Sequence, residues 1–143
     1  MRAARWVGGA VAALALAGPA AASALPRTNT ELGSQQIRPV RIGYTGDGSA
    51  ILGGFTKYRR LHKSDPLKRF GRLHWTVYNH REGRATGADW VDDFIPDGAT
   101  GTFLPIRCTI HVYRPRHGIF TRMTLVEQGH SVTFHAHGTN WFA

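Results

Sequence analysis

Apolar and polar residues alternate with a period of two along several stretches of this chain. In the clearest stretch, residues 103–113, polar side chains alternate with those of Leu104, Ile106, Cys108, Ile110 and Val112. Successive side chains of a β-strand point to opposite faces of the sheet, so the pattern predicts a strand with one buried face. We expect the Cys108 thiol to lie on that buried face.

Five further stretches have the length and alternation of strands. They are residues 38–45, 73–78, 84–91, 119–126 and 131–137, and turn-forming residues such as Gly, Pro and Asp separate them. No stretch after residue 24 shows a helical period over three turns. Short strands with such regular turns are typical of antiparallel sandwiches and barrels. We therefore expect a mostly β fold, a small antiparallel sandwich or barrel of about six strands.

Residues 1–24 have a different pattern. Arg2 and Arg5 precede a short apolar run, residues 7–17, and an A-x-A site follows at 22–24. This order is typical of a secretory signal peptide, and the run is shorter than the roughly 20 apolar residues that a membrane-spanning helix needs. We expect cleavage before Leu25, a secreted extracellular protein, and no integral membrane segment in the mature chain.

The remainder of the chain, residues 25–143, is long enough for one ordinary domain. Residues 25–37 are polar and unpatterned, which predicts a flexible N-terminal arm, and residues 38–143 are expected to form a single β domain. Cys108 is the only cysteine, so no disulfide forms within the chain. A reactive thiol needs exposure and a lowered pKa, so a buried core thiol is favoured over a catalytic pair with a histidine.

Positive charge is concentrated in one segment. The whole chain carries a net charge of +9; without Arg2 and Arg5 it has 16 Lys and Arg against 9 Asp and Glu, a charge of +7. Residues 57–72 account for +6 of this, because Asp65 alone opposes Lys57, Arg59, Arg60, Lys63, Lys68, Arg69 and Arg72.

Three aromatic rings, Tyr58, His62 and Phe70, are interleaved with these basic residues. Such a segment is typical of a surface that binds anionic polymers or lipid headgroups, and equally of a solvated loop that serves solubility. Because the chain has no DNA-reading helix and no aromatic RNA-binding signature, we expect no sequence-specific binding of nucleic acid. The expected function is therefore binding of anionic cell-envelope or extracellular polymers through the basic segment.

An alternative function rests on three histidines. His135 and His137 share one face of the last expected strand, and His130 lies in the preceding turn. This spacing suits two metal ligands and a third, as in a small metal-dependent extracellular hydrolase, although an exposed pair of histidines is the commoner role. The regular spacing of the known calcium loop is absent from the four acidic residues of the next candidate, Asp89, Asp92, Asp93 and Asp97. We expect no cofactor.

Two other roles stay open from the sequence. An aromatic sugar-binding face would use Trp90 and Trp141, whereas Trp75 shares the parity of Leu73 and is expected in the core. The second of these roles is pairing of a flat sheet edge with another envelope protein.

Several segments, taken in order, resemble a known family. They are residues 39–49 (PVRIGYTGDGS), 53–54 (GG), 73–75 (LHW), 85–90 (ATGADW), 96–101 (PDGATG), 113–116 (YRPR) and 120–124 (FTRMT). In this order and spacing the chain resembles a family of small secreted actinobacterial proteins of unknown function, over about residues 38–125. The resemblance implies no particular activity. Family members usually carry two cysteines around the loop proline, where this chain has Phe94 and Gly98, so the resemblance implies that a loop disulfide is missing here.

Overall fold

The computed structural model describes residues 23–30, 33–63, 70–95 and 99–143, and these residues form strands and turns without a helix. The expected signal peptide lies almost wholly outside the described residues. The strands are β1 (Thr28–Asn29), β2 (Gln35–Gln36), β3 (Ile42–Gly43), β4 (Ala50–Gly53), β5 (Leu61–His62), β6 (His74–Tyr78), β7 (Glu82–Asp92), β8 (Thr102–Arg116), β9 (Ile119–Glu127), β10 (His130–His137) and β11 (Asn140–Phe142). The expected mostly β, antiparallel fold is confirmed.

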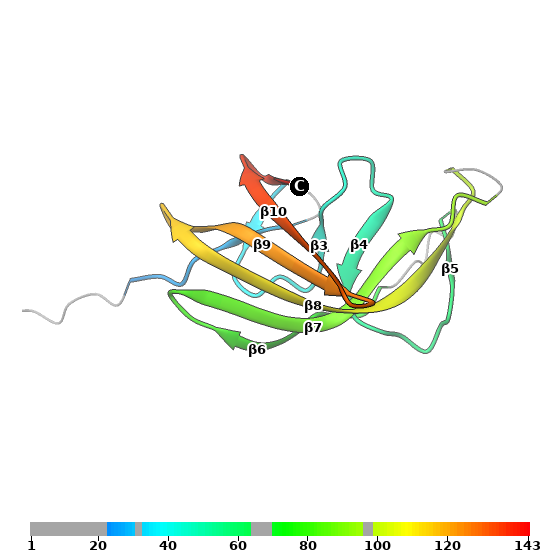
Figure 1. Ribbon diagram of the computed structural model, residues 1–143, viewed down its shortest axis with the longest axis horizontal. Coiled ribbons are helices and arrows are strands. Elements are labelled where there is room, and N and C mark those ends of the chain that lie inside the picture. The colour runs from blue at the N-terminus through cyan, green and yellow to red at the C-terminus, as the bar shows by residue number, and fades with distance from the viewer. Residues whose placement is uncertain (1–22, 31–32, 64–69, 96–98) are drawn as a thin grey trace, which may run out of the picture.

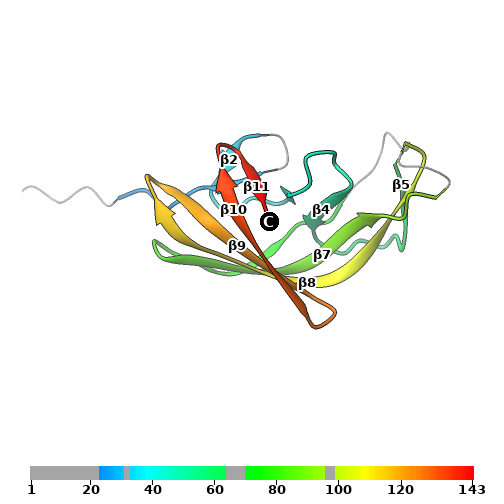
Figure 2. The same cartoon turned by 45° about the horizontal axis from the view of Figure 1, so that its top comes forward.

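Nine of the strands form one sheet and β1 and β2 form a second, small one. The main sheet runs β11-β10-β9-β8-β7-β4-β3, while β5 pairs with β8 and β6 pairs with β7. The sheet curls into a nearly closed, barrel-like shape. In Figures 1 and 2, β7 and β8 run along the length of the molecule as one curved ribbon, and the β3–β4 and β10–β11 hairpins fold above the same face of it.

The β7–β8 ladder is the longest pairing, because all 11 residues of β7 face a partner on β8, from Glu82 opposite Tyr113 to Asp92 opposite Phe103. The alternation predicted for this strand is present. Cys108 is 2% exposed and packs on the inner face, which confirms the expected buried thiol. Buried and more exposed positions therefore alternate in β8 from Arg107 to Tyr113, whereas Leu104, Pro105 and Ile106 are all half-buried.

Two apolar clusters lie on opposite faces of β7. The main core fills the inner face and contains Ile42, Leu52, Leu73, Tyr78, Ala85, Cys108, Ile110, Val112, Phe120, Met123, Leu125, Phe134 and Trp141. A second cluster joins Leu61, Ala88, Trp90 and Phe103, with Phe70 packed against it. Trp90 and Trp141, whose role the sequence left open, are thus both buried, and Trp75 packs partly buried against the main core.

The described residues 25–30 and 33–37 differ from the expected flexible arm. Thr28 and Asn29 are fully buried: the Thr28 hydroxyl bonds the Tyr78 hydroxyl at 2.9 Å, and Asn29 Nδ2 donates to the carbonyl oxygen of Asn140 at 3.0 Å. The Arg27 amide donates to the Gly118 carbonyl oxygen. This segment is held by hydrogen bonds rather than by an apolar stripe, so its polar composition concealed its packing.

Other boundaries also differ from the expected ones. The stretch 38–45 contributes only the two residues of β3, and the short strands β4 and β11 were not expected. Because β4 is four residues long and holds Gly53, it has too few alternating side chains to produce a pattern. Short strands of this kind form because longer neighbours offer them a sheet edge.

Glycine is required at position 87, where the end of β4 approaches the backbone of β7 closely. A Cβ atom at Gly87 would clash with the carbonyl oxygen of Gly53 and press on the Leu73 side chain. The first of these contacts is to backbone, which cannot move aside without shifting the β4–β7 ladder. Close approach of the two strands therefore depends on Gly87.

We expect Gly87→Ala to lower the free energy of unfolding by ~1–3 kcal/mol, measured by urea denaturation, because the added methyl group overpacks this crossing. The matched control is Gly46→Ala, where the added atom meets open space. The control should change stability by less than ~0.5 kcal/mol. Equal losses in the two variants would contradict the proposed close approach.

Candidate functional site

The basic segment is anchored across one end of the sheet by apolar residues. Leu61 of β5 is buried and pairs with Phe103 of β8. The Phe70 ring packs edge-on against Phe103, with 5.3 Å between centroids, and lies 5.6 Å from the Trp90 ring. The Trp90 indole N–H donates to the Gly54 carbonyl oxygen at 3.0 Å. These contacts hold both ends of the segment against the second apolar cluster.

Of the seven basic residues predicted to bind anions, five lie in the described part of the chain. Four of these are exposed: Lys57, Arg59, Arg60 and Arg72. The remaining two, Lys68 and Arg69, lie outside the described residues. The chain that leads from β4 to β5, at the lower right in Figure 1, carries Lys57, Arg59 and Arg60. Arg72 lies beside the end of β4, where its neighbour Gly71 bridges Gly54.

Lys63 differs from the other predicted binding residues. Its ammonium group lies 3.0 Å from Asp92 Oδ2, and the Asp92 side chain is fully buried. The other Asp92 oxygen accepts a hydrogen bond from the Phe94 amide. A buried carboxylate needs such partners, so Lys63 stabilises the loop that follows β7.

Two exposed aromatic rings accompany the cations. Phe55 is 48% exposed and Tyr58 is 49% exposed. The Lys57 ammonium lies 5.2 Å from the centre of the Tyr58 ring, and the Arg107 guanidinium lies 5.2 Å from the centre of the Phe55 ring. Arg107 stands on β8, far from the basic segment in sequence, so the sequence alone did not connect it with that segment.

We call the resulting area the basic–aromatic surface. It consists of Phe55, Lys57, Tyr58, Arg59, Arg60, Arg72 and Arg107. Asp93 lies beside it, and there Arg60 helps to lower the carboxyl pKa, after the larger effect of hydrogen bonds from the Thr102 and Ile95 amides. The surface can attract anions through its charge and pack flat groups against its rings.

The three candidate metal-binding histidines are not assembled into a site. His130 is the first residue of β10, and His135 and His137 lie at its other end; all three are exposed. Seven residues of strand span roughly 23 Å, so the first and last cannot reach one ion. Within the described ranges, no group of three His, Cys, Asp or Glu side chains is placed to hold a metal ion.

The four acidic residues considered for calcium binding do not form a shared site at the three that the structure describes. Asp93 Oδ1 accepts hydrogen bonds from the Thr102 amide at 2.9 Å and the Ile95 amide at 3.0 Å. Asp92 binds Lys63, and Asp89 points to the interior; Asp97 lies outside the described residues. These carboxyl groups therefore face different directions rather than one calcium ion.

The interior of the sheet holds a polar cluster that sequence reasoning missed. Asp89 is fully buried, and its Oδ2 accepts a hydrogen bond of 2.6 Å from the Tyr44 hydroxyl. Burial raises the pKa of Asp89 to about 7; the Tyr44 hydrogen bond opposes this rise and the neighbouring Glu127 carboxyl group adds to it. Burial and, next, the Asp89 hydrogen bond raise the pKa of Tyr44 as well.

The Cys108 thiol adjoins this cluster. Burial raises its pKa to about 12, with further contributions from Asp89 and Glu127. A thiol this basic stays protonated at neutral pH and is a poor nucleophile. The catalytic pair of Cys108 with a histidine therefore has no support in the geometry.

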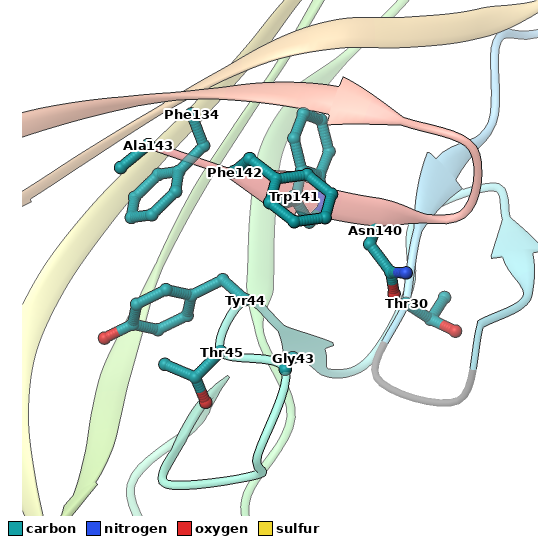
Figure 3. Close-up of a pocket in the computed structure, with 10 residues that line it drawn as sticks. Thr30, Gly43, Tyr44, Thr45, Phe134, Asn140, Trp141, Phe142 and Ala143 are labelled. Carbon is teal, nitrogen blue, oxygen red and sulfur yellow. The ribbon is translucent and has the colours of Figure 1, made fainter.

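A pocket of about 340 Å³ opens near Tyr44, between the β10–β11 hairpin and the turn that follows β3 (Figure 3). Tyr44 and Phe134, whose rings pack edge-on at 5.1 Å, belong to its wall. The full lining is Thr30, Gly43, Tyr44, Thr45, Gly46, Phe134, Asn140, Trp141, Phe142 and Ala143. Tyr44 is thus shared by the pocket and the interior cluster.

No protein-family model, curated protein or solved structure matches this chain. The resemblance to small secreted actinobacterial proteins accordingly stays a prediction. Among the residues that the structure covers, no helix is long and apolar enough to span a membrane.

Substitution of Lys63 and of Lys57 tests whether the Lys63 ion pair stabilises the folded protein while the exposed Lys57 does not. We expect Lys63→Met to lower the free energy of unfolding by ~1–3 kcal/mol, because the buried Asp92 carboxylate loses its charged partner. Lys57→Met changes an exposed side chain and should alter stability by less than ~0.5 kcal/mol. Urea denaturation of both variants measures the difference, and equal stability would show that the Lys63 ion pair contributes nothing.

Proposed function

We propose that this protein binds anionic polymers at or outside the cell envelope through the basic–aromatic surface. The observation that carries the proposal is the anchoring of the basic segment. Leu61 and Phe70 fix it to the sheet, so its exposed cations occupy set positions and less conformational entropy is lost on binding. A solvated loop that served solubility alone would need no such anchoring.

The chemistry of the surface supports a polymer of repeated negative charges. Lys57, Arg59 and Arg60 lie close together near the start of the segment, Arg72 adds charge at its end, and Arg107 adds charge from β8. Each exposed ion pair contributes only about 0.2–1 kcal/mol, so useful affinity requires several contacts at once. A chain of phosphate or sulfate groups supplies them.

The proposed location outside the cell rests on the expected signal peptide. Ser23 and Ala24 are exposed, and Leu25, directly after the expected cleavage site, is the first described residue that packs against the main core. Cleavage before Leu25 would therefore leave the packed residues intact. The metal-dependent hydrolase has no comparable support, because its three histidines do not converge.

The test measures binding of the protein to long-chain inorganic polyphosphate by isothermal titration calorimetry. We expect the triple variant Lys57→Gln, Arg59→Gln and Arg60→Gln to bind roughly tenfold more weakly than the natural protein, since three surface contacts contribute about 1.4 kcal/mol together. Binding of the natural protein should weaken as salt is added. Vesicles of anionic lipid, assayed in parallel, distinguish a membrane surface from a soluble polymer.

The matched control removes the same charge from the other end of the molecule. Its three substitutions are Arg81→Gln, Arg114→Gln and Arg116→Gln, all at exposed positions near the opposite ends of β7 and β8. The control should keep most of the affinity. Equal weakening in the two triple variants would mean that net charge alone attracts the polymer, and the proposed surface would be wrong.

A further inference from the structure

Asp89 and Glu127 are two carboxyl groups that meet on the inner face of the sheet. On this face Glu127 of β9 is paired with Cys108 of β8, and Cys108 in turn with Gly87 of β7, two residues before Asp89. Gly87 has no side chain, and the Glu127 carboxyl group is close enough to add to the rise in the Asp89 pKa that burial mainly causes. The two acids therefore belong to strands that are not neighbours and meet across β8.

The hydrogen bonds around the pair are incomplete. Asp89 Oδ1 and Glu127 Oε2 are both buried, and neither accepts a hydrogen bond from a donor in the described part of the chain. The Tyr44 hydroxyl supplies one donor, to Asp89 Oδ2. Leaving two buried carboxylate oxygens without donors or a cation is costly, and two adjacent carboxylates repel each other. One proton held between the two groups removes both penalties.

We propose that Asp89 and Glu127 form a proton-operated latch: one shared proton holds Glu127 on the inner face of the sheet, and loss of that proton turns the Glu127 side chain to solvent. Glu127 is the member that moves, because it is only half-buried and ends β9 beside the β9–β10 turn. Asp89 is fully buried and keeps its hydrogen bond to Tyr44.

The latch acts on the wall of the pocket. Tyr44 lines the pocket with its ring while its hydroxyl donates to Asp89. A negative charge on Asp89 therefore strengthens the hydrogen bond that orients the ring, while its two partners stay the same. The titratable groups that face the pair are Tyr44 from the turn after β3 and Cys108 from β8. The pKa of each is raised, so both stay protonated while the carboxyl pair titrates.

The sign of the pH effect follows from the raised pKa of Asp89. Its ordinary value is 3.8 and its value in the folded protein is about 7, so the folded protein binds more protons than the unfolded chain between these values. The contribution of the pair to stability is therefore present at low pH and is lost as the pH rises to about 7.

The direct experiment is an NMR titration of side-chain carboxyl carbons in the natural protein, from pH 3 to 9. We expect the Asp89 carboxyl carbon to report an ionisation near pH 7, and the ring signals of Tyr44 to shift with the same midpoint. Two ionisations at ordinary carboxyl values would overturn the shared proton. A Tyr44 ring that does not respond would overturn the coupling to the pocket.

A pair of variants tests the same idea by stability. The amide of Asp89→Asn replaces the shared proton permanently, so its melting temperature relative to the natural protein should rise as the pH goes from 5 to 8. The control Asp47→Asn changes an exposed carboxyl group whose pKa is lowered by hydrogen bonds from Ser49, so its difference should stay flat over this range. A flat difference for Asp89→Asn as well would contradict the latch. If Asp89→Asn does not fold, the carboxyl titration of the natural protein still decides the question.

Discussion

The pairing of β7 with β8 is the interaction on which the other parts of this structure depend. Its ladder extends over all of β7, and β4, β5, β6 and β9 each pair with one of these two strands. Because strand side chains alternate, the same two strands present the main core on the inner face and the second apolar cluster on the outer face near one end. Both the exposed cations and the buried acids are positioned by that alternation.

The ladder also separates opposite charges. On the inner face it holds Asp89 among buried residues, beside Glu127, where a proton rather than a cation compensates the charge. At the same end, but on the outer side, Trp90 and Phe103 support the basic segment through Phe70. A chain with a large positive charge thus keeps part of its negative charge inside, and the cations remain exposed to partners.

The sequence predicted the features that arise from repetition. The long alternation around Cys108 correctly indicated a half-buried strand, and four of the five described cations in the basic run are exposed. The sequence could not predict contacts between residues that the sheet brings together from distant parts of the chain. Nothing in the sequence linked Asp89 to Tyr44, Arg107 to the basic segment or Thr28 to Tyr78, because these partners lie far apart in sequence.

The central claim, that anionic polymers bind at the basic–aromatic surface, is tested most directly by mapping the contact. Amide chemical shifts of the natural protein would be recorded during titration with a short polyphosphate. We predict that the largest changes fall at residues 55–60, 72 and 107, with little change around residues 114–117 at the opposite end. Changes spread over both ends, or confined to the pocket beside Tyr44, would contradict the account.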